Sequence, residues 1–244
     1  MRLRSGHPVT RFERIDSTNA EARRLAEQGE RGPLWLWADA QTGGRGRMGR
    51  TWVSEPGNLY ATFLFSIAAG PEVAAQVSFV AALAVHDTVA ALRSNLQPRI
   101  KWPNDVLING AKFCGVLPEV VGSSPTRIAI GCGVNIAHAP QGTPYPVTAL
   151  GGDLQVESVL QQLDASISKR LEIWDEGRGF PAIRKAWEAR ALGLGGVASS
   201  GEFEGTFTGL APDGAMILTT ADGRSHHIHS GEVKFAALER LRSP

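Results

Sequence analysis

The sequence predicts an α+β protein in which a mixed β-sheet flanked by helices is followed by a small β-barrel of SH3-like size. Apolar runs of strand length alternate with helical stretches as far as about residue 190. An Asn-Gly pair at 109–110 lies between two apolar runs, which is a strong hairpin signal. After a glycine-rich break at 192–196 the chain has only short strand-like runs with Asp-Gly turns. We therefore expect one domain over residues 1–190 and a second over 191–244.

The first half of the chain is expected to contain two strands between two helices. The first helix runs from 21 to 28, because Thr18 followed three residues later by Glu21 forms a capping box and Gly29 ends the pattern. Apolar, aromatic and branched residues then predict strands at 34–38 and 58–67. An alanine-rich stretch with an apolar face predicts a long helix over 71–95.

The Asn-Gly pair predicts a hairpin with a two-residue type I′ turn. Residues that pair directly or alternate along a strand share one face of a sheet. Lys112 and Asp105 are therefore expected as diagonal neighbours on one face, about 7–8 Å apart. They form either a salt bridge at the sheet rim or a pair that faces a ligand, with the lysine neutralising an anion. The expected pairs are Ile108 with Ala111, Leu107 with Lys112, and Asp105 with Cys114.

The remaining elements are predicted from periodicity and turn signals. A strand over 126–136 contains Gly131-Cys132-Gly133, and glycines inside a strand often mark a close approach by a ligand or backbone. Helices are expected over 156–174 and 181–190. Short strands are expected over 202–208, 215–220, 224–229 and 232–235.

Composition limits the classes of function. The chain has 244 residues, 43% of them hydrophobic, and a formal net charge of +1, which gives no bulk attraction to nucleic acid or membrane. Charged and polar residues interrupt the longest apolar stretches, and the N-terminus lacks the apolar core of a signal peptide, so no membrane span or leader is expected. Two cysteines, Cys114 and Cys132, are read as buried thiols in a reducing cytoplasm. His226, His227 and His229 are more typical of a polar strand edge than of a metal site.

A glycine- and arginine-rich loop, the Gly-Arg loop (residues 43–52), separates the two predicted strands. Glycines allow the backbone to approach a ligand, and arginines offer fork-shaped donors to phosphates and carboxylates. The loop is either an anion-binding element or a solvated basic turn. Its formal G-x-G-x-x-G match at 44–49 does not predict a dinucleotide site, because Pro56 and Gly57 prevent the helix that this site requires.

Five motifs in this order and spacing resemble the biotin–protein ligase family over nearly the whole chain. They are Ser17-Thr18-Asn19; Gln41 with the Gly-Arg loop; Lys101-Trp102-Pro103-Asn104-Asp105; Lys112-Phe113-Cys114-Gly115; and Gly131-Cys132-Gly133-Val134-Asn135-Ile136. The resemblance implies a class II synthetase-like catalytic domain, of the biotin/lipoate ligase fold, followed by an SH3-like barrel. It implies an enzyme that joins biotin to ATP, with Mg²⁺, and passes biotin from biotinyl-5′-AMP to a lysine of the biotin carboxyl carrier protein of acetyl-CoA carboxylase.

The resemblance also implies roles for individual residues. Lys112, Arg45 and Arg47 would be catalytic, with Lys112 bridging the biotin carboxylate and the α-phosphate. Asp105 would orient Lys112 or a water bound to Mg²⁺. The biotin site would comprise Ser17, Thr18, Asn19, Gln41, Arg45, Gly46, Arg47, Lys112 and Gly115. The ATP site would comprise Arg47, Arg50, Trp52, Lys101, Asn104, Asp105, Lys112 and Asn135.

Further expectations follow from differences between this chain and the family pattern, and from alternative functions of the same fold. Pro118 interrupts a predicted strand, which indicates a sheet edge or a bulge there. The chain starts directly at the catalytic region, so we expect the monofunctional type without an N-terminal DNA-binding domain, and no operator binding. A lipoate or octanoate ligase of the same fold and a non-catalytic biotin sensor are the alternatives. The protein is expected in the cytoplasm, as a monomer or a homodimer.

Overall fold

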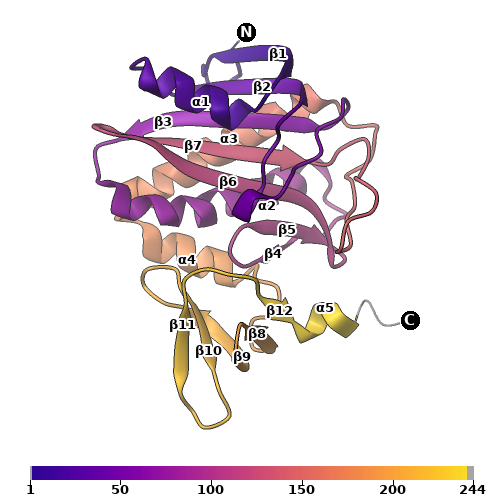
Figure 1. The fold of residues 1–244 in the computed structure, drawn as a ribbon, viewed down its shortest axis with the longest axis vertical. Helices are drawn as coiled ribbons and strands as arrows, with labels where there is room; N and C mark the ends of the chain where they lie inside the picture. Colours follow the sequence, from indigo (N-terminus) through magenta and orange to yellow (C-terminus); the bar gives the residue numbers. More distant parts are fainter. Residues whose placement is uncertain (1, 241–244) are drawn as a thin grey trace.

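A computed structural model describes residues 2–240 and contains two separate sheets (Figure 1). The larger sheet has seven strands in the order β1-β2-β3-β7-β6-β5-β4, and the smaller has five in the order β11-β10-β9-β8-β12. In the larger sheet only the β1–β2 pair is parallel, so the sheet is mixed as predicted. Its strands are β1 (Val9–Ile15), β2 (Leu34–Gln41), β3 (Leu59–Ile67), β4 (Arg99–Lys101), β5 (Asp105–Ile108), β6 (Ala111–Ser123) and β7 (Thr126–Val134).

Helices cover both faces of the larger sheet, α1 (Thr18–Glu27) on one face and α2 (Val77–Leu92) and α3 (Val156–Trp174) on the other (Figure 1). Alternate residues of β3 divide between these faces, since Leu64 packs in the small cluster with Ala22 of α1 and Phe63 packs in the main core. Short 3₁₀ segments at Arg47–Gly49, Pro71–Gln76 and Asp175–Gly177, and the helix α4 (Phe180–Glu188), complete this part.

The 71–92 segment corrects one expectation from composition. By length and apolar character alone this segment could cross a membrane. The expectation that its polar residues exclude a membrane span is therefore wrong. In the structure the segment lies against the sheet, with residues such as Phe79 and Leu83 buried on several sides of the helix. It is a core helix, which explains why it is apolar almost all round.

The β5–β6 hairpin confirms most of the predicted register. Asn109 and Gly110 both have positive φ, as a type I′ turn requires, and the pairs nearest the turn form as expected. A register shift between Val106 and Leu107 makes Asp105 pair with Gly115 instead of Cys114. The expected Asp105–Cys114 pair is therefore wrong, because a bulge inserts one extra residue on β6.

Pro118 lies where the sequence predicted an edge. It belongs to β6 and pairs with Ile130 of β7, but β5 accompanies β6 only as far as Gly115. Beyond Gly115 one side of β6 has no neighbouring strand in the described sheet, which tolerates a residue without an N–H.

The C-terminal sheet consists of β8 (Val197–Ser200), β9 (Phe203–Leu210), β10 (Met216–Thr219), β11 (Ser225–Ile228) and β12 (Lys234–Phe235), and the helix α5 (Ala236–Arg240) follows. The segment before it stays attached to the larger sheet, since Leu192 N–H donates to Ile100 of β4 at 2.8 Å. The domain boundary between 190 and 191 stays a prediction, and residues 192–196 are where the chain leaves one sheet for the other.

Candidate functional site

A cleft of about 440 Å³ lies where elements distant in sequence converge, within the range of ligand pockets. It brings together the N-terminus of α1, the end of β2, the Gly-Arg loop, the β4–β6 region and the segment 231–239. Fourteen of the fifteen site residues that the sequence predicted line it: Ser17, Thr18, Asn19, Gln41, Arg45, Gly46, Arg47, Arg50, Trp52, Lys101, Asn104, Asp105, Lys112 and Gly115.

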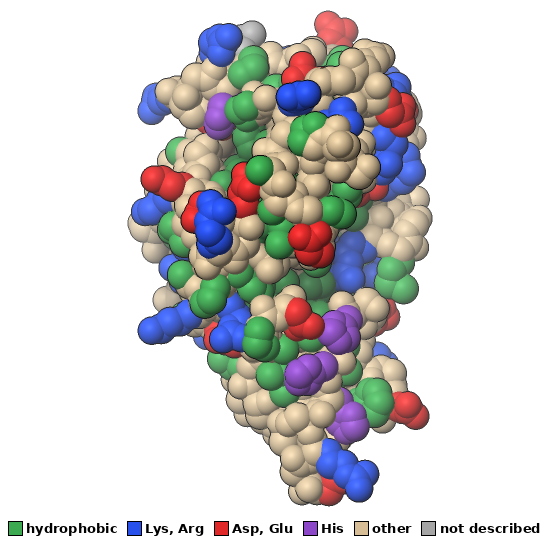
Figure 2. Space-filling view, turned by 90° about the vertical axis from the view of Figure 1, so that its left-hand side faces the viewer, with side chains coloured by type: hydrophobic (Ala, Val, Ile, Leu, Met, Phe, Trp, Pro, Cys, Tyr) green, Lys and Arg blue, Asp and Glu red, His purple; other side chains and the backbone are tan. Residues whose placement is uncertain are grey.

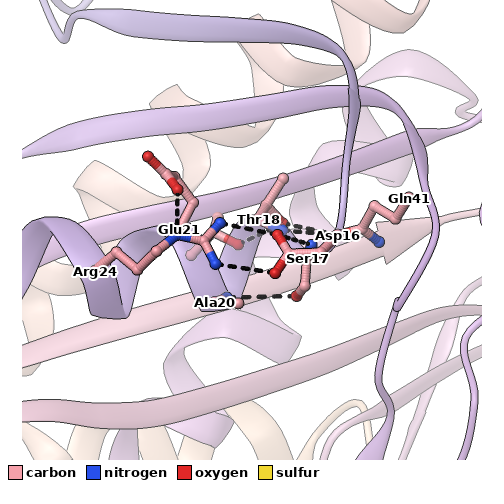
Figure 3. Close-up of polar contacts among 8 residues, drawn as sticks. Asp16, Ser17, Thr18, Ala20, Glu21, Arg24 and Gln41 are labelled. Atoms are coloured by element: carbon pink, nitrogen blue, oxygen red, sulfur yellow. Dashed lines mark hydrogen bonds and ion pairs between the residues drawn. The ribbon is translucent and has the colours of Figure 1, made fainter.

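One end of the cleft is formed by the N-terminus of α1 and the end of β2. The helix cap is Ser17, whose hydroxyl accepts from Ala20 N–H at 3.4 Å, so the expected capping box on Thr18 is wrong. Thr18 instead faces Gln41, and its backbone N–H donates to Gln41 Oε1 at 2.9 Å (Figure 3). This end of the cleft therefore presents neutral hydroxyl and amide groups.

An ion-pair cluster outside the cleft holds this helix start in place (Figure 3). Arg24 donates to both carboxylate oxygens of Asp16 and to Glu21, and its hydrogen bonds lower the pKa of the Asp16 carboxyl to about 2. Because these side chains are largely exposed, we assign the cluster a positioning role and little net stability.

Asn19 lines the cleft but is mostly buried, and its side-chain amide is hydrogen-bonded by the protein itself. Its Nδ2 donates to the carbonyl of Leu117 at 3.1 Å and to Glu119 Oε2 at 2.7 Å, and its Oδ1 accepts from Thr62 at 2.6 Å. A Cβ at Gly131 would collide with the Asn19 side chain. This glycine therefore leaves room for Asn19, whereas the sequence suggested close approach by a ligand or by backbone.

The Gly-Arg loop folds back over the cleft. Arg45 and Thr51 form a β-bridge, and Gly46 N–H donates to Arg50 O at 2.7 Å. Arg47 donates to Asn104 Oδ1 at 3.3 Å on the opposite side of the cleft. Asn104 itself is 3% exposed and its amide donates to the carbonyl of Val116, on the open edge of β6. The guanidinium of Arg47 thus attaches the loop to the opposite wall of the cleft.

Trp52 and Lys112 form the centre of the cleft. The indole lies against Gly115 and Gly133, which pair across β6 and β7, and a Cβ at Gly133 would lie 2.4 Å from the ring. Lys112 Nζ is 5.3 Å from the Trp52 ring centroid and 5.6 Å from that of Tyr145. Two glycines therefore give the aromatic ring and the ammonium a common flat platform.

Lys112 and Asp105 lie on one face as predicted, with Nζ 2.8 Å from Oδ1. The Lys112 side chain is only 16% exposed, and its charge is balanced by one carboxylate. Arg45, Arg47, Arg50 and Lys101 line the same cleft. With Lys234, six cations line the cleft. Together with the neutral end they are suited to a ligand with a polar, uncharged part and an anionic part.

Sequence reasoning missed the contribution of the C-terminal sheet. Glu232 forms an ion pair with Arg50, which lowers the pKa of the Glu232 carboxyl and raises that of Arg50. Residues 231–235, with Leu238 and Glu239, line the cleft beside this pair. No local motif could reveal this contact, because the two residues are 182 positions apart.

Asn135 lies outside the cleft lining, so its placement does not favour the expected contact with adenine. It is 2% exposed and donates through Nδ2 to Thr148 O at 3.1 Å, while its carbonyl accepts from Leu150 N–H at 3.0 Å. These two hydrogen bonds fix the segment 136–150. Within this segment the Pro146 carbonyl accepts from Lys112 N–H at 2.9 Å. Asn135 therefore helps to hold the Lys112 backbone in place through the segment 136–150.

Replacing Asn135 with alanine is expected to lower the free energy of unfolding by about 1–3 kcal/mol, because the half-buried Thr148 carbonyl loses the donor that the buried Asn135 amide supplies. Urea denaturation measures this change. Asn95→Ala, at an exposed asparagine, is the matched control. Equal stability of the two variants would contradict the role of Asn135.

The thiols and histidines add no second site to the described residues. Cys114 and Cys132 are free and buried, as predicted, and burial raises the pKa of Cys132 to about 12 and that of Cys114 well above its usual range. Histidines gather on the tapering part of the molecule that the C-terminal sheet forms (Figure 2). Among residues 2–240 no group of three or more His, Cys, Asp or Glu side chains could hold a metal. His226 instead stacks on Phe203, and His229 lies 3.6 Å from Asp213.

Comparison with known proteins matches both parts of the chain. A model of the biotin/lipoate A/B protein ligase family matches residues 11–135, and a model of the biotin protein ligase C-terminal domain matches residues 197–235. A biotin–[acetyl-CoA-carboxylase] ligase of Paracoccus denitrificans is 42% identical over 226 residues, which are 86% of this chain and 94% of that protein.

Two further relatives support the same assignment. The bifunctional ligase/repressor BirA of Bacillus subtilis is 31% identical over 86% of this chain and 68% of its own length. The structure of a biotin protein ligase from Aquifex aeolicus in complex with biotin and ATP superposes with a TM-score of 0.78 at 30% identity. The superposition covers 93% of this chain and 98% of that one.

Proposed function

The chain belongs to the biotin/lipoate A/B protein ligase family, and from that premise we propose that it is a biotin–[acetyl-CoA-carboxylase] ligase. It activates biotin with ATP to biotinyl-5′-AMP and transfers biotin to a lysine of a biotin carboxyl carrier protein. The observation that carries this assignment is the cleft itself, in which Lys112 and the arginines of the Gly-Arg loop surround a space whose other end is neutral and hydrogen-bonding.

In the first step a carboxylate oxygen of biotin forms a bond to the α-phosphorus of ATP, and the bond to pyrophosphate breaks. Both reactants are anions, so cations must offset their repulsion and stabilise the charge that develops on phosphorus. Lys112 meets this need because it is fixed by Asp105 and partly shielded from water. Arg45 and Arg47 are placed to hold the carboxylate and phosphate, and Arg50 to hold the phosphates once they displace Glu232.

In the second step the acceptor amine attacks the biotinyl carbonyl carbon, AMP leaves, and the amine loses a proton. The mixed anhydride must be protected from water until then, which a loop closed over the cleft achieves. The hydrogen bond from Arg47 to Asn104 holds the loop in this closed position. The glycine platform beneath Trp52 leaves the upper face of the indole as a surface on which a base can stack.

Mg²⁺ enters this proposal with ATP as part of the substrate. Among the described residues no cluster of three acidic or metal-binding side chains is present, and Asp105 already pairs with Lys112. Mg²⁺ usually retains several waters and needs only one or two carboxylates beside the phosphates. Asp105 is therefore assigned a contact with a Mg²⁺-bound water, not a direct bond.

The remaining parts of the proposal concern partners and place. The acceptor is the carrier domain of acetyl-CoA carboxylase, and neither nucleic acid nor membrane is a proposed partner. We place the protein in the cytoplasm as a monomer or homodimer. A lipoate or octanoate ligase is the rival, because the matching family model spans both kinds of enzyme.

The direct test is ATP–pyrophosphate exchange with biotin, lipoate and octanoate as separate acids. Exchange with biotin alone supports the proposed adenylation. Exchange with lipoate or octanoate instead would favour the rival, and binding of biotin without exchange would indicate a sensor.

A further inference from the structure

A chain of hydrogen bonds behind the neutral end of the cleft has only one consistent direction. It begins at Asn19, whose amide nitrogen lies within hydrogen-bond distance of two groups that can only accept, the Leu117 carbonyl and the Glu119 carboxylate. Turning the Asn19 amide over would place its oxygen against both acceptors. Asn19 Oδ1 must therefore point at Thr62.

Thr62 then has no choice of acceptor. Its hydroxyl carries one proton and lies 2.6 Å from Asn19 Oδ1 and 2.7 Å from Thr18 Oγ1. Since an amide oxygen cannot donate, Thr62 donates to Asn19. At 2.7 Å the contact between the two threonine oxygens requires a proton, which must come from Thr18.

The Thr18 hydroxyl also lies 3.2 Å from Gln41 Oε1, but the shorter 2.7 Å contact with Thr62 takes its proton. Thr18 is thereby left as an acceptor toward the cleft. The neighbouring Gln41 is fixed by the same reasoning. Ser54 donates to the Trp52 carbonyl at 3.0 Å, so it must accept from Gln41 Nε2 at 2.9 Å, and Gln41 Oε1 accepts from Thr18 N–H. The amide nitrogen of Gln41 keeps a second N–H that can donate to a carbonyl in the cleft.

Thr62 is 0% exposed and does not line the cleft, and sequence analysis gave no reason to select it. It lies on β3 opposite Gly131, the glycine that leaves room for Asn19. Glu119 anchors the far end of the network and is itself paired with Arg23 of α1. The network thus runs from the surface of α1 through the sheet to the cleft.

We propose that Thr62 and Asn19 are positioning residues that fix Thr18 as a hydrogen-bond acceptor, so that the cleft selects a ligand head group with an N–H donor beside a carbonyl. A cyclic urea has both groups, whereas a dithiolane ring or an alkyl chain has neither. This inference rests on the proposed function, because it explains how a biotin site rejects lipoate and octanoate. A site that is built to hydrogen-bond a polar group discriminates strongly against an analogue that lacks it.

The experiment is calorimetric titration of Thr62→Val, Thr62→Ser and the parent protein with biotin and with biotin methylated on its ureido nitrogens. Valine is nearly isosteric but removes the hydroxyl, whereas serine retains it. In Thr62→Val the Thr18 hydroxyl keeps only the longer 3.2 Å contact with Gln41 Oε1, so it can turn its proton toward the cleft. We therefore expect Thr62→Val to bind biotin about 10-fold more weakly, and Thr62→Ser to bind as the parent does. The penalty for N-methylation is expected to be about 10-fold smaller in Thr62→Val than in the parent.

Thr88→Val is the matched control, because Thr88 is also a buried threonine, with its hydroxyl donated to Ala84 within α2. It is expected to leave both affinities unchanged. Equal affinity of Thr62→Val and the parent would overturn the proposal, and so would an equal loss for both ligands, which indicates general damage to the cleft. If Thr62→Val does not fold, Thr62→Ala is titrated with the same outcomes. Failure of the parent to bind biotin would instead refute the proposed function.

Discussion

Replacing Lys112 with alanine is expected to reduce biotin-dependent pyrophosphate release by about 10²–10³-fold, the usual cost of removing one preorganised electrostatic donor. Lys112 Nζ is held by Asp105 at 2.8 Å and lies between the Trp52 and Tyr145 rings, so the ammonium is in place before substrates arrive. Biotin-dependent ATP–pyrophosphate exchange measures the loss. We expect the affinity for biotin to fall much less than the rate, because the charge acts mainly as negative charge develops on phosphorus.

Two variants separate this role from damage to the fold. Lys112→Met keeps most of the aliphatic stem against Trp52 without the charge, and it should be as slow as Lys112→Ala. Lys185→Ala removes an exposed lysine of α4 and should be as fast as the parent. A wild-type rate for either Lys112 variant would remove this residue from the catalytic step.

The sequence predicts the interior elements of the fold well because their signals are local. The bounds of α3 are as predicted, and the type I′ turn at Asn109 is confirmed, since both depend on residues a few positions apart. β1 was missed because it is an edge strand with an exposed face, on which Arg11 pairs with Asp39 and covers Trp37. Charged residues on an edge strand hide the alternation from which strands are predicted.

The residues of the candidate site likewise divide into those with a local sequence signal and those without one. Short motifs such as Ser17-Thr18-Asn19 and Lys112–Gly115 carry their own signal, and the structure gathers them around one cleft. Glu232 and Thr62 have no motif, and their partners are reached only after the chain has folded. The bulge that moves Asp105 opposite Gly115 was also hidden, because turn geometry fixes register only until an extra residue intervenes.

Replacing Arg47 with glycine is expected to slow adenylate synthesis far less than Lys112→Ala does, because Arg45 and Lys112 still line the cleft. The release of free biotinyl-5′-AMP is expected to rise about 10-fold to 100-fold. The contact between Arg47 and Asn104 spans the cleft and fastens the Gly-Arg loop. A hydrogen bond to a charged group contributes about 1.5–3 kcal/mol, which sets the size of the expected change. The measurement is the amount of adenylate that passes a filter retaining the protein, relative to pyrophosphate formed.

Met48→Gly separates the effect of losing the Arg47–Asn104 contact from the effect of a more flexible loop. Met48 neighbours Arg47, is 73% exposed and has a φ of 57°, a conformation that glycine adopts readily. Glycine there loosens the same loop but leaves the Arg47–Asn104 contact intact, so the adenylate should stay bound as in the parent. If Met48→Gly leaks as much as Arg47→Gly, flexibility alone controls retention. If Arg47→Gly retains the adenylate more tightly than the parent, the guanidinium opens the loop instead of closing it.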